Sequence, residues 1–212
     1  MIVSRNLILL PFLLFAFSVN SLGANRIIIN FENTPSISQE IELIKNIKNY
    51  SSAKQMQSYL QNESWIDHFL IKSSFFGNSI HAFIRSKKPQ YIWRDQFYLD
   101  QHLTKFTYDG GHPELMHLNM PLEYLITWVN IESQYINLFN NHNLMIKSAA
   151  FEPVIGWYLI TDTSLRINLG DDLLDSTYQK LALTLKYMFE NKLTPSIIDL
   201  RYKAGAALNY GK

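Results

Sequence analysis

Apolar and polar positions divide the chain into an N-terminal apolar run and two regions of mixed pattern. The first 24 residues carry a positive charge at Arg5, an apolar run from Leu7 to Phe17, and then small and polar residues. A membrane-spanning helix needs about 20 apolar residues and a signal-peptide core about 7–15, and this run lies between those classes. The charge favours a cytoplasmic N-terminus. We therefore expect residues 1–24 to export the rest of the chain, either as a retained membrane-anchor helix or as a cleaved signal peptide.

The second region, residues 25–92, has the pattern of a small mixed domain. Residues 26–31 (RIIINF) predict a strand, and two capping-box sequences, SISQ and SAKQ, each precede apolar residues at helical spacing. Two strand-like segments follow, residues 65–76 and 79–89, and the Gly77-Asn78 pair between them is a hairpin signal. The predicted order is strand, helix, helix, strand, strand, which places two helices on one face of a three-stranded sheet.

The third region, residues 93–212, predicts more strands and two further helices. Short strands are expected over residues 91–109 and 144–172, and a loop rich in Gly and Pro over residues 110–121. The apolar stripe of the first helix is Leu122, Leu125, Ile126, Val129, Ile136 and Phe139, and that of the second is Leu174, Tyr178, Leu181, Leu185 and Met188. The predicted fold class is therefore α+β.

The last predicted strand has one apolar and one charged face. Ile198, Leu200 and Tyr202 alternate with Asp199 and Arg201, which is typical of a sheet that is packed on one side only. Two interpretations remain open. The segment is either an interior C-terminal strand with solvated charges, or an edge strand whose free main-chain groups accept a strand from another protein, which is β-augmentation. In the second case, the small residues 204–207 would allow close approach of that chain and Tyr210 would supply an aromatic contact.

Composition excludes several classes of function. The 212 residues contain 19 Lys and Arg against 18 Asp and Glu, and a net charge of +1 lacks the positive field that nucleic-acid binding needs. Cysteine is absent, which excludes disulfides, thiolate zinc sites, cysteine nucleophiles and lipid attachment to a cysteine. The sequence has no nucleophile elbow, phosphate-binding glycine loop or metalloprotease motif. We therefore expect no enzyme activity and no cofactor.

Two clusters of titratable residues have simpler explanations than chemistry. His112 and His117 lie five residues apart in a predicted loop, whereas a zinc site needs three or four convergent ligands. Asp171, Asp172 and Asp175 precede the last predicted helix, where the positive end of the helix dipole favours carboxylates. We expect neither a metal site nor a catalytic carboxylate pair.

Three stretches resemble one protein family. The C-terminal stretch IDLRYKAGAAL resembles the signature of the FtsQ/DivIB family of bacterial cell-division proteins. The stretch from Trp157 to Leu181 is similar to the family's Trp-x-Leu, Leu-x-Leu-Gly and Lys-Leu pattern, and ESWIDHFLIKSSFFGNSIHAFIRSKKP resembles the end of its POTRA domain. The order of the predicted elements also matches. One departure lies at Gln101-His102-Leu103, where a glycine is common in the family.

The resemblance implies a specific architecture and role. It implies a single-pass, type II protein of the bacterial inner membrane with its bulk in the periplasm at the division septum: an anchor at residues 1–24, a POTRA domain at 25–92 and a C-terminal β domain, mostly antiparallel with two helices, at 93–212. It also implies a non-catalytic scaffold that recruits the FtsB–FtsL complex by strand addition at its last β-strand and meets other division proteins through the POTRA domain. The implied partner-facing residues are Tyr202, Ala204, Gly205 and Tyr210.

An alternative of a different class stays open. A secreted POTRA-type module of an outer-membrane assembly or secretion system would have the same first domain. Such a module would use that domain as its binding surface and would carry a cleaved signal peptide in place of the anchor.

Overall fold

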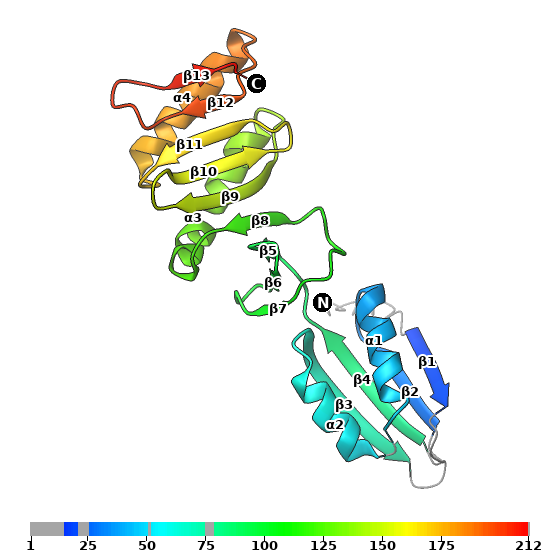
Figure 1. Ribbon diagram of the computed structural model, residues 1–212. Helices are drawn as coiled ribbons and strands as arrows, with labels where there is room; N and C mark the ends of the chain where they lie inside the picture. Colours follow the sequence, from blue (N-terminus) through cyan, green and yellow to red (C-terminus); the bar gives the residue numbers. More distant parts are fainter. Residues whose placement is uncertain (1–14, 21–25, 51, 75–78, 212) are drawn as a thin grey trace, which may run out of the picture. The chain divides into compact units, whose positions relative to one another are not determined.

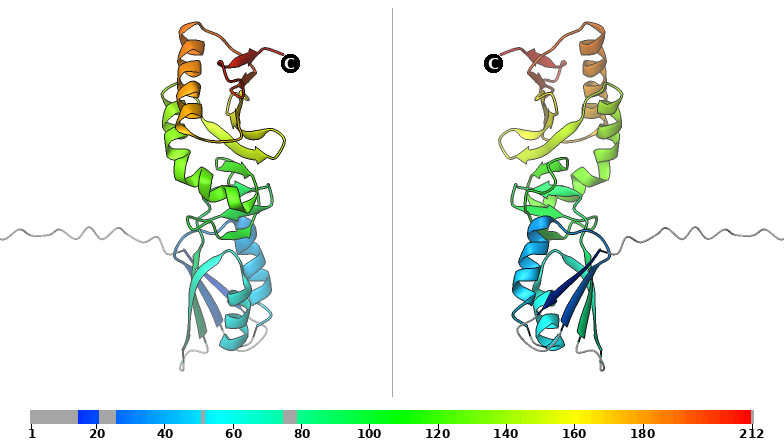
Figure 2. Two further views of the ribbon diagram at one scale, coloured as in Figure 1. Left: turned by 90° about the vertical axis from the view of Figure 1, so that its left-hand side faces the viewer. Right: turned by 90° about the vertical axis from the view of Figure 1, so that its right-hand side faces the viewer.

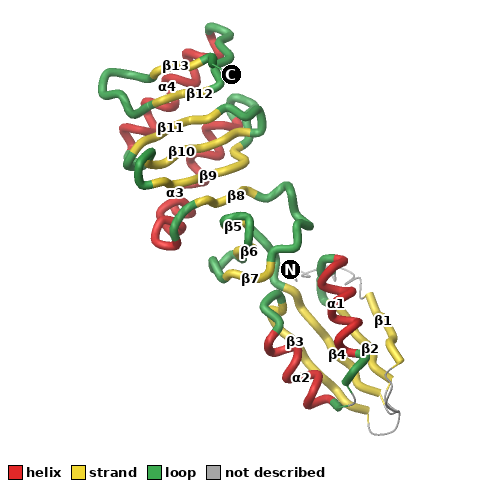
Figure 3. The backbone as a smooth tube through the Cα atoms, in the orientation of Figure 1, coloured by secondary structure: helices red, strands yellow, loops and turns green. Residues whose placement is uncertain are grey.

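The computed structural model describes residues 15–20, 26–50, 52–74 and 79–211 of the chain. The chain divides into two compact units, Met1–Lys88 and Pro89–Lys212, each with its own sheet (Figure 1). Both units mix helices and strands, as Figure 3 shows, which confirms the predicted α+β class. Within the described ranges, no helix combines the length and apolar character that crossing a membrane requires.

The first unit is a four-stranded mixed sheet with two helices on one face (Figure 2). Its strand order is β1-β2-β4-β3, where β2 and β4 are parallel and the outer pairs are antiparallel. The predicted order of strand, helix, helix, strand, strand is the observed one from residue 26 onward. The elements are β1 (Phe15–Asn20), β2 (Arg26–Phe31), α1 (Ile37–Ile47), α2 (Ala53–Asn62), β3 (Ile66–Ser74) and β4 (Ser79–Ser86).

Local signals place the two helices of this unit. The Ser36 hydroxyl accepts a hydrogen bond from the Gln39 main chain and the Gln39 side chain accepts one from Ser36 N, which confirms the first capping box. Ser52 accepts in the same way from Gln55 N at the start of α2. The helices bury apolar residues against the sheet, and the core includes Ile27, Ile29, Leu43, Ile47, Met56, Leu60, Ile80, Ala82 and Ile84.

The N-terminal prediction needs a correction. Residues Phe15–Asn20 form strand β1, which pairs in antiparallel register with β2, instead of continuing an apolar helix. Because residues 15–17 pair with β2 as a strand, they cannot also belong to an anchor helix. The rest of the predicted anchor, residues 1–14 and 21–24, and the hairpin signal Gly77-Asn78 lie outside the described residues.

The second unit is built on a nine-stranded sheet of order β13-β12-β11-β10-β9-β8-β5-β6-β7. Five of its eight strand pairs are antiparallel, and both helices cover the same face (Figure 2). The elements are β5 (Tyr91–Trp93), β6 (Phe97–Leu99), β7 (Lys105–Thr107), β8 (Met116–Asn119), α3 (Leu122–Asn140), β9 (Ile146–Glu152), β10 (Gly156–Thr161), β11 (Arg166–Gly170), α4 (Asp175–Glu190), β12 (Ile197–Asp199) and β13 (Ala207–Asn209).

Strand β8 was not predicted. Residues 110–121 were expected to form a loop, but β8 (Met116–Asn119) runs parallel to both β5 and β9 in the middle of the sheet. The Gly and Pro residues that favoured a loop flank the strand on both sides. A four-residue strand gains its stability from its neighbours rather than from its own composition, so the local pattern does not show it.

The turn between β6 and β7 contains the departure from the family pattern. Leu103 has φ +59°, a left-handed conformation that glycine adopts without steric cost. Its N–H donates to Asp100 O at 3.0 Å, and its side chain packs against the core. Glycine would adopt this conformation without steric cost, whereas leucine accepts the cost and gains contact with the core.

Aromatic residues dominate the core between α3 and the sheet. The predicted stripe of α3 was partly wrong: Leu125 and Phe139 are buried, but Leu122 and Ile126 are 64% and 54% exposed. Trp128 is fully buried instead and stacks 6.5 Å from Trp157. Tyr135 is also buried in this core. Nearby, the Tyr91 hydroxyl donates a 2.5 Å hydrogen bond to Glu132 Oε1, while Glu132 Oε2 is buried without a hydrogen-bond partner in the described part of the chain.

Candidate partner-binding edge at the C-terminal strands

The predicted edge strand is not the edge of the sheet. Strand β12 (Ile197–Asp199) pairs in parallel with β11 on one side and antiparallel with β13 on the other. The chain leaves the strand at Leu200, turns through residues 201–206 and returns as β13 (Ala207–Asn209). The small residues 204–206 thus belong to the turn. The hypothesis of an open ladder along residues 197–203 is therefore wrong, because both sides of β12 are already paired.

The described sheet has two edge strands, β7 and β13, and β13 is the one beside β12. Among the strands described, none pairs with β13 on the side away from β12. The Asn209 carbonyl accepts a hydrogen bond from Ser196 N at 2.8 Å and so points toward β12. Successive residues of a strand direct their main-chain groups to opposite sides, so the N–H and C=O of Leu208 point outward. An open strand edge is a template for another chain.

Side chains give β13 two different faces. The half-buried Leu208 packs against the apolar core, whereas Ala207 and Asn209 are exposed. A strand added beside β13 would therefore continue the same two-faced sheet, with its apolar side chains on the helix side. The strand has only three residues, so β13 presents a short edge.

The four predicted site residues lie on both sides of β13 rather than along one strand. Tyr202 is 59% exposed in the β12–β13 loop, and Ala204 is exposed beside it. Gly205, in the same loop, has φ +157° and open space where a Cβ would lie. Tyr210 follows β13 directly and is 55% exposed. The loop residues and Tyr210 thus flank the edge strand, which the sequence argument did not identify. The small residues 204–206 could have indicated a turn, with a short strand returning after it over residues 207–209.

An ion pair holds the start of the loop. Arg201 Nη2 lies 2.6 Å from Asp199 Oδ2, and Arg201 Nε lies 2.9 Å from Asp199 Oδ1. The Arg201 main-chain N–H also donates to this carboxylate. The Arg201 guanidinium therefore keeps the pKa of the Asp199 carboxyl below its usual value. These contacts turn the chain directly after β12.

Sequence comparison gives this edge a context. The chain is 24% identical over 161 residues to the cell division protein FtsQ of Vibrio cholerae serotype O1, a match that covers 73% of this chain and 60% of the relative. The chain is thus similar in sequence to an FtsQ protein. Because the match covers 60% of the relative, the chain spans less than two thirds of that curated relative's length. No protein-family model matches the chain.

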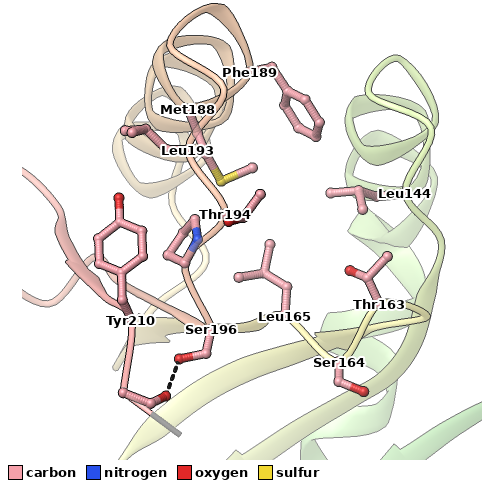
Figure 4. A pocket seen from close by; sticks show the side chains of 12 residues that line it. Leu144, Thr163, Ser164, Leu165, Met188, Phe189, Leu193, Thr194, Ser196 and Tyr210 are labelled. Atoms are coloured by element: carbon pink, nitrogen blue, oxygen red, sulfur yellow. Dashed lines mark hydrogen bonds between the residues drawn. The ribbon is translucent and has the colours of Figure 1, made fainter.

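The chain also has an apolar pocket beside the end of β13. A cavity of about 510 Å³ lies at the end of the sheet where β11 and β12 begin. Tyr210 lies at its rim (Figure 4). Its lining combines apolar side chains with hydroxyls and comprises Leu144, Thr163, Ser164, Leu165, Met188, Phe189, Leu193, Thr194, Pro195, Ser196, Tyr210 and Gly211. Ser196 Oγ donates to the carbonyls of Asn209 and Gly211, which ties the end of β13 to the start of β12.

The two clusters of titratable residues make local contacts. His112 Nδ1 lies 3.0 Å from Glu114 Oε1, and His117 Nδ1 lies 2.6 Å from Asp95 Oδ1. Asp172 Oδ1 accepts from Leu174 N and from the Thr177 hydroxyl at the start of α4. Within the described ranges, no three such side chains gather at a spacing that suits a metal ion.

Proposed function

We propose that this chain is a non-catalytic scaffold of bacterial cell division. The proposal rests on two independent observations. The similar protein from Vibrio cholerae is a cell division protein by name, and the similarity extends over 73% of this chain. The second unit ends in an edge strand, β13, that leaves one side unpaired among the described strands.

The scaffold binds the FtsB–FtsL complex by strand addition at β13. The C-terminal signature suggests these partners, and the outward N–H and C=O of Leu208 supply the main-chain groups that strand addition uses. Tyr202 and Tyr210 flank the strand as exposed aromatic contacts, and Ala204 and Gly205 leave room for the partner. Because β13 is only three residues long, side-chain contacts beside it must supply much of an interface of standard size, roughly 1,600 Å².

The first unit has a second role in this proposal. Residues 25–92 act as a POTRA domain that meets other division proteins, and residues 93–212 act as the C-terminal β domain. The arrangement β2-α1-α2-β3-β4, with two helices on one face, supports this assignment. Strand β3 (Ile66–Ser74) lies at an edge of the first sheet and is its longest described strand.

We also propose that the chain is anchored in the inner membrane at the septum, with both units in the periplasm. The similarity of the chain to a cell division protein supports this location. A blot of membrane and soluble fractions for the full chain, with mass spectrometry of its N-terminus, tests the proposal. A full-length chain in the membrane fraction is expected. A soluble periplasmic chain that lacks its first residues would favour the secreted POTRA-type module instead.

Binding of the periplasmic FtsB–FtsL pair to the full chain tests the docking edge. Tyr202→Asp introduces a charge into the loop that flanks β13, and we expect it to weaken binding at least about tenfold because an unpaired charge would be desolvated at the interface. Leu122→Asp is the matched control. It adds the same charge at a residue of similar exposure, 64% against 59%, directly after β8, five positions from β13 in the sheet.

Hydrogen exchange locates the bound strand. On binding, the outward amide of Leu208 should become protected, because it then donates to the added strand. Complex formation without new protection at Leu208, or Tyr202→Asp and Leu122→Asp variants that bind equally well, would contradict strand addition at β13. Gly205→Val is a less selective variant, because φ +157° is a conformation that residues with side chains rarely adopt.

A further inference from the structure

Strand β13 depends on polar contacts at its C-terminal end and on the loop that leads to its N-terminal end. Its only half-buried side chain is Leu208, so apolar burial contributes little to holding these three residues. At its C-terminal end, Ser196 N donates to Asn209 O at 2.8 Å, and Ser196 Oγ donates to Gly211 O at 2.7 Å. The N-terminal end is reached through the β12–β13 loop, so the position of the edge depends on what holds that loop.

A lysine of helix α4 holds the loop. Lys180 Nζ donates to the main-chain carbonyls of Leu200 at 3.0 Å and of Tyr202 at 2.9 Å. Leu200 is itself buried, and its N–H donates to Asn168 O of β11 at 2.9 Å. Among the described residues, no carboxylate lies within ion-pairing distance of Lys180. The ammonium group therefore directs its hydrogen bonds to the loop, and hydrogen bonds from a charged donor are stronger than neutral ones.

We propose that Lys180 is a positioning residue that fixes the β12–β13 loop and so presents the β13 edge in a binding-ready conformation before any partner arrives. The inference rests on the proposed function of that edge. Lys180 bonds to main-chain carbonyls, so its role does not require any particular side chain in the loop. A lysine that preorganises the edge removes an ordering cost from association, since a partner strand then pairs with a strand that is already in place.

Hydrogen exchange of the free full chain separates positioning from general stability. Lys180→Met keeps the length and helix propensity of the side chain but removes the donor. We expect amides of residues 201–209 to exchange about tenfold faster or more, with little change elsewhere in the unit or in Tm. Lys186→Met is the matched control on the same helix. The Lys186 side chain is 68% exposed and forms an ion pair with Glu190 at 3.9 Å, so its removal should leave these amides unchanged. Lys180→Arg retains donors and should restore most of the protection.

Two results would overturn the proposal. The first is equal exchange of residues 201–209 in the Lys180→Met and Lys186→Met variants. The second is a uniform loss of protection across the second unit, which would make Lys180 a general stabilising residue.

Binding of the FtsB–FtsL pair completes the test and keeps the two proposals distinguishable. Lys180→Met should weaken binding by the ratio of the binding-ready fractions of the two proteins, which the protection of the loop amides measures, because only the ordered fraction pairs with a partner. Binding that stays unchanged although these fractions differ would overturn the link between the lysine and docking. If Tyr202→Asp leaves binding intact, the docking proposal fails, whereas the exchange measurement still decides whether Lys180 fixes the loop.

Discussion

Gly156 is the position where a single added carbon should cost the second unit most. It begins β10 with φ +79° and is buried. An alanine Cβ at this position would lie 2.3 Å from Gly170 O and 2.4 Å from Gly170 C, both main-chain atoms of the neighbouring strand β11. Neither atom moves without the strand, and the two strands are paired at this point through Trp157 and Gly170.

The expected magnitude has two parts. Placing alanine in a left-handed conformation costs about 1 kcal/mol or slightly more relative to glycine. Restoring ordinary contact at 3.4 Å requires a displacement of roughly 1 Å between β10 and β11, and overpacking of this kind costs about 1–3 kcal/mol. Together the loss is about 2–4 kcal/mol, which corresponds to a fall in Tm of roughly 8–15 °C for a unit of this size.

Gly110→Ala is the control for Gly156→Ala. Gly110 has a similar φ of +77°, but no atom lies within 4 Å of the Cβ position, so only the conformational cost applies. Denaturant unfolding of both variants, followed by tryptophan fluorescence, measures the difference, since Trp93, Trp128 and Trp157 all belong to the second unit. Equal losses of stability in the two variants would refute the reasoning, because they would mean that the approach of β10 to β11 is not rigid.

Two further predictions concern pH. Burial raises the pKa of Glu132, so its contribution to stability is full below the unfolded pKa of about 4.3 and is lost as the pH rises through the folded pKa. Glu132→Gln should therefore be more stable than wild type at pH 7 by about 1 kcal/mol, with the gain disappearing near pH 4 in urea unfolding curves; a pH-independent difference would contradict this. Asp199 has a lowered pKa, so its contribution is present above about pH 4 and is lost as the pH falls through the folded value. Asp199→Asn should be less stable at pH 7 by about 0.5–1 kcal/mol but equal to wild type in acid, as measured by thermal unfolding.

Local signals in the sequence predicted the long elements. The capping box at Ser36 and the 3-4 spacing of Leu181, Leu185 and Met188 specify helices without help from distant residues, and both helices formed. The stripe of α3 was harder, because this helix carries apolar residues on several faces. The aliphatic pattern favoured Leu122, which is exposed. It did not include Trp128, which is buried and stacks on Trp157.

The short strands at and near the site could not be predicted from the sequence pattern. β8 has four residues and β13 three, and each exists because a neighbouring strand supplies hydrogen bonds. The alternating pattern correctly indicated a strand with one buried face, since Ile198 and Leu200 are buried, but it predicted too long a strand: β12 ends at Asp199, and Tyr202 is 59% exposed. Periodicity cannot show that the chain turns back after Leu200. That turn moved the open edge from β12 to β13.

Strand β8 joins two blocks of the second sheet, β5–β7 on one side and β9–β13 on the other. If its pairing failed, the sheet would separate there. The number of unpaired edge strands in the two blocks would then double from two to four, namely β7, β5, β9 and β13. The newly exposed edges of β5 and β9 are rich in apolar residues and would promote aggregation between molecules. A disruptive substitution of the fully buried Leu118 in β8 should therefore produce insoluble protein in the cell before it produces a loss of partner binding.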